Sequence, residues 1–529
     1  MKVTEHAFLS PEPEVAIENI FDRPYDNAVA TARTCYSARG VVSAADVAGD
    51  GVEDPVRRAR RQAVRDSVAV STYRAGHHTT LQHAHVQFRL ANVSRQFIWS
   101  FLHSHPFYNS EQVSQRYVAV KPGGVIVPPL SGEALETYRR TVDAQAEAYV
   151  SLAEELEPAV AEAYFGTFRA RRGNPRYAPE VAKRAREIAR YVLPVGTFAY
   201  LYHTVSVVTL LRYWRMCAQG DVPLETSEVV GRMVARLLEK DPQFEKILED
   251  PIPLEESPEC ELVSRASGAD RSRFAEEFDR ALGGRTSRLV DWKPRNEEIL
   301  AGAVREVFGL AEAQLGDDEA IALALDPARN RLLGSALNVT THSRLLRALA
   351  HPSYTFRKKL SHAADSQDQR HRMTPGSRPA SSAYLSEEPD YVVPRLIRGS
   401  GSALRRYEAA MRAAWDAIEK LRRLGVPPEF RTYLLPNAVS VRFTQSADLL
   451  NLRHKMAMRL CYNAQEEIWQ ASVEEAAQIR DVNPRIGKYL LPPCGSRHRS
   501  GETPICPEGV RFCGVPVWRL DLAEYRRVL

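Results

Sequence analysis

The chain repeats one order of sequence landmarks in its two halves, and this constrains its fold more than any other feature of its 529 residues. His83 and His351 each stand five residues before a phenylalanine, at Phe88 and Phe356. Nineteen residues after each histidine comes a polar triplet, Leu102-His103-Ser104 or Arg370-His371-Arg372. Shared landmarks in a fixed order predict that the two halves are copies of one plan.

Each half then continues with an extended segment ending in proline, a long helix and a second proline-ended segment. The predicted helices are 133–164 and 402–425, where apolar residues recur every three or four positions. The motifs YVLP (191–194) and YLLP (433–436) follow, each leading into another helix-like stretch. A few strands with several long helices in each copy predict an α+β fold whose two tandem copies form a pseudo-dimer.

The segment between the copies, 250–273, is rich in Pro, Glu, Ser and Gly and predicts a linker. A boundary near residue 290 follows. The first domain is then 1–290, including a linker at about 245–290, and the second is 291–529 with a cysteine-bearing tail.

Composition excludes several classes of protein. Hydrophobic residues make up 44% and charged residues 26%, as in globular proteins. Lys and Arg total 71 against 66 Asp and Glu, a net charge of +5 that is too weak to indicate nucleic-acid binding. We expect no membrane span, because no run of 18 apolar residues occurs, and no signal peptide at the start. The seven cysteines are odd in number and unevenly spread, which favours a cytoplasmic location.

The second copy concentrates candidate anion-binding groups, at Arg370, Arg372, Arg442 and Arg459. A guanidinium matches phosphate with two parallel donors and stays charged. If 437–470 is mainly helical, Arg442 and Arg459 project from one helix face, because 17 residues are close to whole turns. The alternative is that these are ordinary surface arginines on amphipathic helices.

The first copy contains a polar run, NSEQVSQRYV (109–118), that offers Glu111, Ser114, Gln115 and Arg116. A hydroxyl, an amide and an arginine in one loop could hold a nucleotide. The alternative is a polar turn that leads into a strand.

Together these motifs resemble the flavin-dependent thymidylate synthase family. The family's pattern is Arg-His-Arg, then a Glu-x-Ser-x-Arg loop, then Leu-Pro, then an arginine before Ala-Gln. Here it is divided between the copies, and the loop is longer, with two residues between Glu111 and Ser114. The resemblance implies binding of FAD and methylation of dUMP to dTMP. Methylenetetrahydrofolate would be the carbon donor and NADPH would reduce the flavin. The family's chains are about half as long and form tetramers, which implies a homodimer here.

The resemblance also implies a substrate site shared between the copies. Its predicted residues are Glu111, Ser114, Gln115 and Arg116 of the first copy and Gln367, Arg370, Arg442 and Arg459 of the second. Of these, Ser114, Arg370 and Arg459 are the predicted catalytic residues. The complementary positions are lost: Trp99, Tyr200 and Cys217 stand opposite Gln367, Arg442 and Arg459. The chain is therefore expected to keep one composite nucleotide site and to have abandoned its symmetry mate.

Flavin contacts are implied by the same resemblance. The candidates are His83, Asn109, Glu111, His351, His371 and Arg372. Two further family contacts are absent, since their positions read Ser206 and Val208, or Asp448 and Leu450. This departure leaves two alternatives open: a nucleotide-binding pseudoenzyme, or a flavoenzyme that modifies a different pyrimidine nucleotide.

The tail holds Cys494, Cys506 and Cys513 near His498. Some members of the family have a similar ending. Paired CxxC motifs typical of zinc sites are absent, so we expect free thiols and no metal, with zinc as the alternative. Cys461, beside Arg459, is interpreted as a packing residue.

Overall fold

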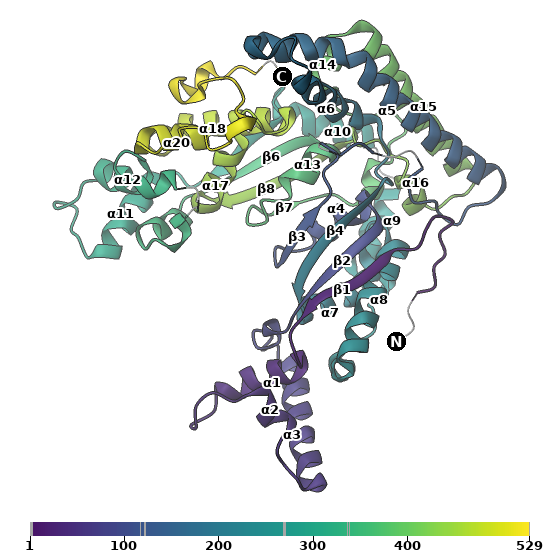
Figure 1. Ribbon diagram of the computed structural model, residues 1–529, viewed down its shortest axis with the longest axis vertical. Coiled ribbons are helices and arrows are strands. Elements are labelled where there is room, and N and C mark those ends of the chain that lie inside the picture. The colour runs from purple at the N-terminus through teal and green to yellow at the C-terminus, as the bar shows by residue number, and fades with distance from the viewer. Residues whose placement is uncertain are drawn as a thin grey trace.

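The computed structural model describes residues 4–116, 118–120, 123–267, 271–335, 337, 339–527 and 529. Two antiparallel four-stranded sheets form its centre, in the orders β1-β2-β4-β3 and β5-β6-β8-β7 (Figure 1). The strands are β1 (Glu14–Ile20), β2 (His85–Ser94), β3 (Tyr108–Gln112), β4 (Phe198–Ser206), β5 (Ser287–Trp292), β6 (Ser353–Ser361), β7 (Gly376–Ser377) and β8 (Ser440–Asp448). The identical strand order shows that the two halves are tandem copies of one α+β fold.

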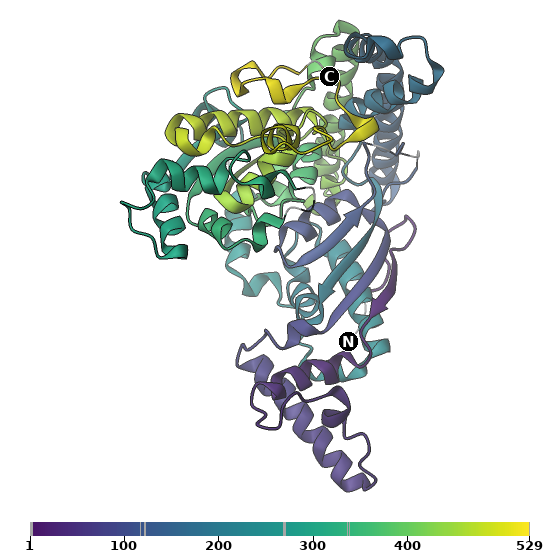
Figure 2. The ribbon, with the colours of Figure 1, turned by 60° about the vertical axis from the view of Figure 1, so that its left-hand side comes forward.

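Helices surround the sheets, and they follow a similar order along the chain in the two copies. In the first copy they are α1 (Pro24–Thr34), α2 (Ala44–Ala48), α3 (Pro55–Arg74), α4 (Arg95–His103), α5 (Gly132–Thr167), α6 (Ala178–Ala189), α7 (Val207–Arg215) and α8 (Pro223–Lys240). Between the copies lie α9 (Pro258–Ser267) and α10 (Arg271–Leu282). In the second they are α11 (Asn296–Phe308), α12 (Asp317–Leu325), α13 (His362–Asp368), α14 (Arg395–Arg398), α15 (Gly401–Arg423), α16 (Pro428–Thr432), α17 (Leu449–Arg459), α18 (Glu466–Val482), α19 (Pro484–Gly487) and α20 (Pro493–Ser500). Helices α1–α3 project from the rest of the molecule as an arm (Figures 1 and 2).

The two long helices are where the sequence predicts them, in α5 and α15. Their apolar positions form buried stripes that include Tyr149 and Leu152 in α5 and Met411 and Trp415 in α15. The two helices lie side by side, one from each copy (Figure 1). Packing of an amphipathic face, more than intrinsic propensity, stabilises helices of this kind.

A β-bulge in β2 shifts the correspondence between the two triplets by one residue. The register of β1 and β2 with their neighbours shifts, and Asn92 adopts a left-handed backbone with φ of 55° between Leu90 and Val93. This extra residue makes the first copy one residue longer before the helix that follows. The helix N-caps Ser94 and Ser361, each accepting a hydrogen bond from the amide three residues on, fix the true register. Counting nineteen residues from each histidine was therefore wrong by one.

With the bulge included, Arg370 corresponds to His103 of the first copy, and Trp99 corresponds to Ser366. The first copy still carries no arginine at the three positions equivalent to 370–372, which read His103, Ser104 and His105.

The prediction that 437–470 is mainly helical is wrong in its first part. Residues 440–448 form β8, which pairs along its length with β6, and the helix α17 begins only at Leu449. Arg442 therefore lies on a strand and Arg459 at the end of a helix, so they do not share a helix face. This segment forms a strand rather than a helix because Val441 and Phe443 are buried between the sheet and its helices.

The copies are joined by backbone hydrogen bonds that repeat about a pseudo-twofold axis. The amide of Val195 donates to the carbonyl of Leu435 at 2.8 Å, and the amide of Asn437 donates to the carbonyl of Leu193 at 2.8 Å. Each bond is the other with the copies exchanged, as an isologous dimer interface requires. The YVLP and YLLP motifs thus form the joint between the copies.

Side chains repeat the same exchange. Glu225 accepts hydrogen bonds from Ser94 of its own copy and from Tyr433 of the other, at 2.6 and 2.8 Å. In the reverse direction, Glu467 accepts from Ser361 and from Tyr191 at 2.6 and 2.8 Å. Burial raises the pKa of Glu225 to about 7, although these donors favour its ionised form.

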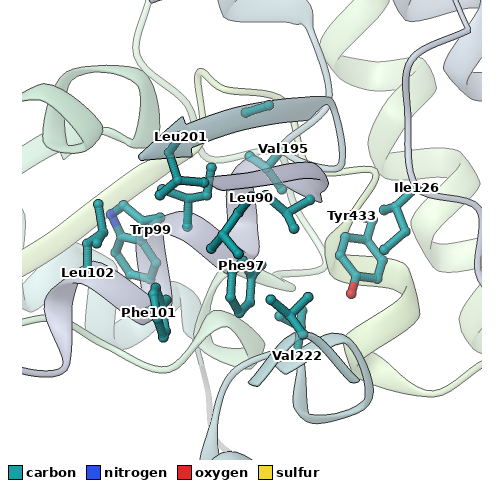
Figure 3. Close-up of a cluster of buried hydrophobic side chains, with 14 of the residues drawn as sticks. Leu90, Phe97, Trp99, Phe101, Leu102, Ile126, Val195, Leu201, Val222 and Tyr433 are labelled. Carbon is teal, nitrogen blue, oxygen red and sulfur yellow. The ribbon is translucent and has the colours of Figure 1, made fainter. Parts of the chain in front are cut away.

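One hydrophobic core runs through the joint. Figure 3 shows Tyr433 of the second copy beside Ile126, Phe97 and Val222 of the first. A second core fills the distal part of the second copy, around residues such as Leu300 and Tyr354. No helix among the described residues is long and apolar enough to cross a membrane.

The segment between the copies is more ordered than a plain linker, because it contains α9 and α10. The domain boundary drawn between 290 and 291 falls inside β5, which pairs with β6 of the second sheet. Asp279 of α10 bonds to Lys359 of β6 and to Arg442 of β8. This helix therefore packs on the second sheet rather than hanging free.

Candidate functional site

Three cavities form a continuous trough between the copies along β3. Their volumes are about 800, 270 and 60 Å³. The large and middle cavities share Asn109 and Arg372, and the middle and small cavities share Gln112 and Arg370. Arg370 and Arg372 come from the second copy and the other two residues from the first. The trough is thus a composite of both copies.

Residues of the two copies line the small cavity in nearly equal measure, and the set contains no carboxylate. They are Arg95, Gln112, Val113, Ser114, Gln115, Arg190, Ala363, Ser366, Gln367, Arg370 and Asn437. The structure therefore brings four predicted substrate residues together here: Ser114, Gln115, Gln367 and Arg370.

Two buried arginines give this cavity its charge. Arg95 is 8% exposed and its Nη2 donates to the carbonyl of Val113 at 2.7 Å, but its Nε has no hydrogen-bond partner. Arg190 is 4% exposed, and its Nε and Nη2 lack partners. Burial lowers the pKa of Arg95 to about 9, as expected for a cation without a close counterion. Unpartnered buried donors of this kind are satisfied by an anion.

Hydrogen-bonding side chains complete the wall. Gln115 accepts a bond from Asn437 at 3.2 Å while its own Nε2 stays without a partner. Ser114 Oγ accepts from the amide of Arg116 at 3.2 Å. Gln367 donates to Gln465 at 3.3 Å.

The middle cavity is closed by contacts between β3 and the loop after α13. Arg370 forms an ion pair with Glu111, both exposed at the rim. Arg372 donates to Asn109 Oδ1 at 3.1 Å and to the carbonyl of Pro106 at 3.2 Å, with its guanidinium 5.2 Å from the centre of the Tyr108 ring. These contacts hold the second copy's loop against the first copy's strand.

The large cavity contains three of the predicted flavin contacts: His83, Asn109 and Arg372. The rest of its wall mixes aromatic, aliphatic, hydroxyl, amide and imidazole side chains, including Phe21 and Tyr108. Its volume lies within the usual range for pockets that bind organic cofactors. A mixed apolar and cationic wall of this size suits a flavin ring with a charged tail.

Arg116 and Arg459 lie behind the small cavity rather than in its wall. Arg116 pairs with Glu187 at 2.6 Å and donates to the carbonyl of Asn463 at 3.0 Å. Arg459 donates to the carbonyl of Gln367 at 2.6 Å, its Nε lacks a partner, and burial lowers its pKa to about 10. Arg459 therefore supports the residue that faces the cavity.

Three predicted residues stand apart from the trough. Arg442 lines none of the three cavities, and it is neutralised by Asp279 at 2.8 Å and by Asp390. His351 is exposed at the end of a 3-10 turn, where its carbonyl accepts from Lys293. His371 is partly buried, with its ring 5.9 Å from that of His454.

The residues at the absent flavin contacts act as helix caps and core. Ser206 accepts from the amide of Thr209 and caps α7, and Asp448 accepts from Asn451 and caps α17. Val208 is buried and Leu450 packs on the second core. Ser206 does line the large cavity.

The tail cysteines and Cys461 are partly buried free thiols. Burial raises the pKa of Cys461 to about 11 and that of Cys494 to about 12, which keeps these thiols protonated. Across the described ranges, no group of three or more His, Cys, Asp or Glu side chains is arranged to hold a metal ion.

Arg95, Arg190 and Asn437 were missed by sequence reasoning. Each follows or precedes a landmark that was recognised: Arg95 comes after the strand that contains Phe88, and Arg190 and Asn437 flank the YVLP and YLLP motifs. The sequence shows only that polar or charged residues stand beside these motifs. That the segments meet in space is visible only in the fold.

The fold and the trough define a duplicated α+β protein with a trough, partly cationic, that residues of both copies line. The family described as "Thymidylate synthase complementing protein" matches residues 18–243 and 288–485, well over half of the chain, and the chain belongs to this family.

Curated relatives agree with this assignment. A flavin-dependent thymidylate synthase of Geobacter sulfurreducens is 34% identical over 171 residues, covering 31% of this chain and 70% of that protein. Proteins of the same name from Mycolicibacterium vanbaalenii and Saccharolobus solfataricus are each 29% identical, over 32% and 28% of this chain and 63% and 56% of their own lengths. Each alignment thus covers about a third of the chain.

Proposed function

We propose that the protein is an FAD-dependent enzyme that methylates dUMP to dTMP at one composite site between its copies. The observation that carries this proposal is the small cavity, where Arg95 and Arg190 present unpartnered donors and no carboxylate is among the described residues of its wall. A nucleotide phosphate would satisfy these donors. The names of the curated relatives support the same reaction.

Within this proposal each part of the trough has a role. The two arginines hold the phosphate, and Ser114, Gln115 and Gln367 bond to the sugar and base. Arg370 lies where the small and middle cavities meet, so it stabilises charge that develops on a carbonyl oxygen of the ring. Preorganised donors of this kind contribute several kcal/mol in a site that excludes water.

Arg459 acts as a support for Gln367, and Arg116 holds the loop that carries Ser114. The tests for these two residues are dUMP binding by Arg116→Ala and Arg459→Ala, each of which we expect to be strongly weakened. Normal binding by Arg116→Ala would mean that the first copy does not contribute this half of the site.

The cofactor belongs in the large cavity, where His83, Asn109 and Arg372 would hold FAD and where Glu111 closes the adjoining rim. A bound reduced flavin supplies hydride, with NADPH as its reductant and methylenetetrahydrofolate as the carbon donor. The chain's own contribution is to orient the nucleotide and to hold the loop of the second copy against β3.

Two measurements test the proposal. The purified protein should show a flavin absorbance band, and incubation with ring-tritiated dUMP, folate and NADPH should release tritium. If neither dUMP nor its fluoro analogue binds, the composite site is not a nucleotide site and the proposal fails. Binding of a different pyrimidine nucleotide in preference to dUMP would keep the site and change the substrate.

A second candidate is a nucleotide-binding pseudoenzyme. It is favoured by Ser206 and Asp448, which cap their own helices where the family has flavin contacts. The two candidates separate cleanly, because the pseudoenzyme would bind dUMP without a flavin band and without tritium release.

We also propose that two chains associate in a homodimer in the cytoplasm, which would reproduce the four copies of the family's tetramer. Light scattering at several concentrations tests the assembly, and a mass of one chain at every concentration would contradict it.

A further inference from the structure

Four charged side chains lie buried in the second copy, directly behind the loop that carries Arg370 and Arg372. Their exposed fractions are at most 1%. They are Lys358 of β6, Asp368 at the end of α13, Lys455 of α17 and Glu475 of α18. Two ammonium groups thus face two carboxylates, and we refer to the four as the charge network.

The network centres on Asp368. Lys455 Nζ lies 2.8 Å and Lys358 Nζ 3.3 Å from its Oδ2, and Lys358 also pairs with Glu475 at 2.8 Å. Burial alone would raise the pKa of Asp368, but the two ammonium groups hold it well below the usual range. Asp368 is therefore an ionised anchor, and it stands two residues before Arg370.

The network also reaches the far end of the same loop. Both lysines donate to Gln445 of β8, and Gln445 donates to the carbonyl of Thr374 at 2.9 Å. Thr374 in turn donates through its hydroxyl to the carbonyl of His371 at 2.8 Å. One connected set of hydrogen bonds and ion pairs therefore anchors the 369–374 loop both before Arg370 and after Arg372.

The first copy provides a matched comparison, because its equivalent positions are known from strand register and helix caps. Phe88 pairs with His203 in the first sheet as Phe356 pairs with Gln445 in the second. On this register, the network and Gln445 correspond to Leu90, Phe101, Tyr213, Met233 and His203, all of them buried.

No ion pair occupies that place in the first copy. Phe101 packs on Tyr213 with ring centres 4.1 Å apart and on His203 at 4.8 Å. The same fold is therefore built in one chain with an apolar and aromatic cluster in one copy and with four charges in the other.

This difference needs an explanation, because burying ion pairs is expensive. Replacing a buried ion pair by well-packed apolar residues is often neutral or stabilising. The fold does not require the charges, since the first copy lacks them. What the second copy has and the first lacks is a loop with Arg370 and Arg372 that contacts β3 of the other copy.

We propose that the charge network is a positioning device that fixes the 369–374 loop so that Arg370 and Arg372 meet β3 across the trough. The effect on nucleotide binding rests on the proposed function, whereas the effect on the loop does not. Asp368, Lys358, Lys455 and Glu475 are positioning residues, because none of them lines the cavities.

The first copy supplies the design of the test. In one variant, the charge network and Gln445 are replaced by the residues at the equivalent positions of the first copy. The variant combines Lys358→Leu, Asp368→Phe, Gln445→His, Lys455→Tyr and Glu475→Met. We expect it to melt at the same or a higher temperature than the wild type. The amides of 369–374 should exchange at least about tenfold faster with deuterium, and dUMP affinity should fall roughly tenfold to hundredfold, as for the loss of one charged hydrogen-bonding contact.

If the five-residue variant does not fold, a smaller variant that leaves the net charge unchanged tests the positioning role. Lys455→Met with Asp368→Asn removes the inner pair, and we expect the same faster exchange of 369–374 and weaker dUMP binding. Its control is Arg485→Gln with Glu297→Gln, which removes another pair of the second copy, at 2.8 Å, remote from the loop. The control should lose stability without a change in the loop.

The outcomes separate the two proposals. Unchanged exchange of 369–374 in a folded inner-pair variant would overturn the positioning role, whatever happens to dUMP. Faster exchange in a protein whose wild type binds no dUMP would support the positioning role and refute the proposed function. Loop exchange that rises equally in the Arg485 control would also overturn the proposal, because the effect would then be general destabilisation.

Discussion

The open trough and its pseudo-symmetric counterpart show how one chain can keep a site and close its twin. In the counterpart, Trp99 donates to Asp365 at 2.9 Å, and Arg378 pairs with the same carboxylate at 2.8 Å and stacks 4.1 Å from the Phe443 ring. His103 lies 3.6 Å from Asp365 as well. The closed site has its own carboxylate for its cation, whereas the small cavity of the open site has none.

The difference teaches that the second site was repacked rather than merely eroded. Where the open site has Ser366 and a cavity, the closed site has the buried indole of Trp99. Gln96 and Ser381 bond to each other across the copies in the same region. Protein atoms now occupy the space, so reversing one substitution cannot restore it.

The largest effect that we predict is on stability, from Trp99→Ala. Loss of a buried indole should cost about 3–5 kcal/mol of the free energy of unfolding, measured by urea denaturation. Because Trp99 lines none of the three cavities of the trough, dUMP affinity should stay within about twofold once the variant is folded. A large loss of affinity would mean that the two sites are coupled.

The carboxylates at the joint predict a pH effect of similar size. The pKa of Glu225 is raised to about 7 in the fold, above the 4.5 of an ordinary glutamate, so the fold favours the protonated form. The contribution of Glu225 to stability should be constant below about pH 4.5, decrease by at most roughly 3 kcal/mol as the pH rises to about 7, and then level off. Glu225→Gln should flatten this profile in thermal melts, and an unchanged profile would refute the assignment.

Filling the open site should convert it into a copy of the closed one. Ser366→Trp places in the open cavity the side chain that fills the closed site, and we expect no dUMP binding detectable by calorimetry, because the indole and the nucleotide cannot occupy the same space. The melting temperature should change far less than in Trp99→Ala. Retained affinity would place the nucleotide elsewhere.

Removing charge from the open site should have a smaller effect. Arg190→Met deletes one charged donor set, worth about 1.5–3 kcal/mol, or roughly a tenfold to hundredfold loss of dUMP affinity. Thr432, the buried residue at the equivalent position of the second copy, provides the matched control as Thr432→Ala. Equal losses in both variants would point to a structural effect.

The smallest effect is expected from Ser104→Arg, which places an arginine in the first copy's triplet at the position equivalent to His371. Ser104 is exposed, and the adjoining closed site is already filled, so dUMP stoichiometry should stay at one per chain. Affinity should change by less than about twofold. A second equivalent of bound dUMP would show that the closed site can reopen.

Sequence reasoning reached the duplication and the two long helices, because these depend on periodicity and on the order of landmarks. It failed at Arg442, since a strand buried between neighbours outweighed the helical spacing of two arginines. It misaligned the triplets by one residue, since the bulge at Asn92 leaves no clear mark in the sequence.

Arg95, Arg190 and the charge network lay beyond reach for a different reason. Their significance depends on which segments meet in space, and a single lysine such as Lys455 in a helical stretch reads as surface until its partners are known. Contacts across nearly a hundred residues, as between Asp368 and Lys455, carry no local signal.

The exchanged backbone bonds at the YVLP and YLLP motifs bear on how such a chain could arise. In a symmetric pair of identical subunits every substitution appears at both sites, so neither site can be closed without closing the other. A covalent tether frees the two from this constraint and keeps the partner at high effective concentration. Fusion thus allows the two equivalent surfaces to diverge, so that one can serve as a functional site while the other becomes part of the packed interface.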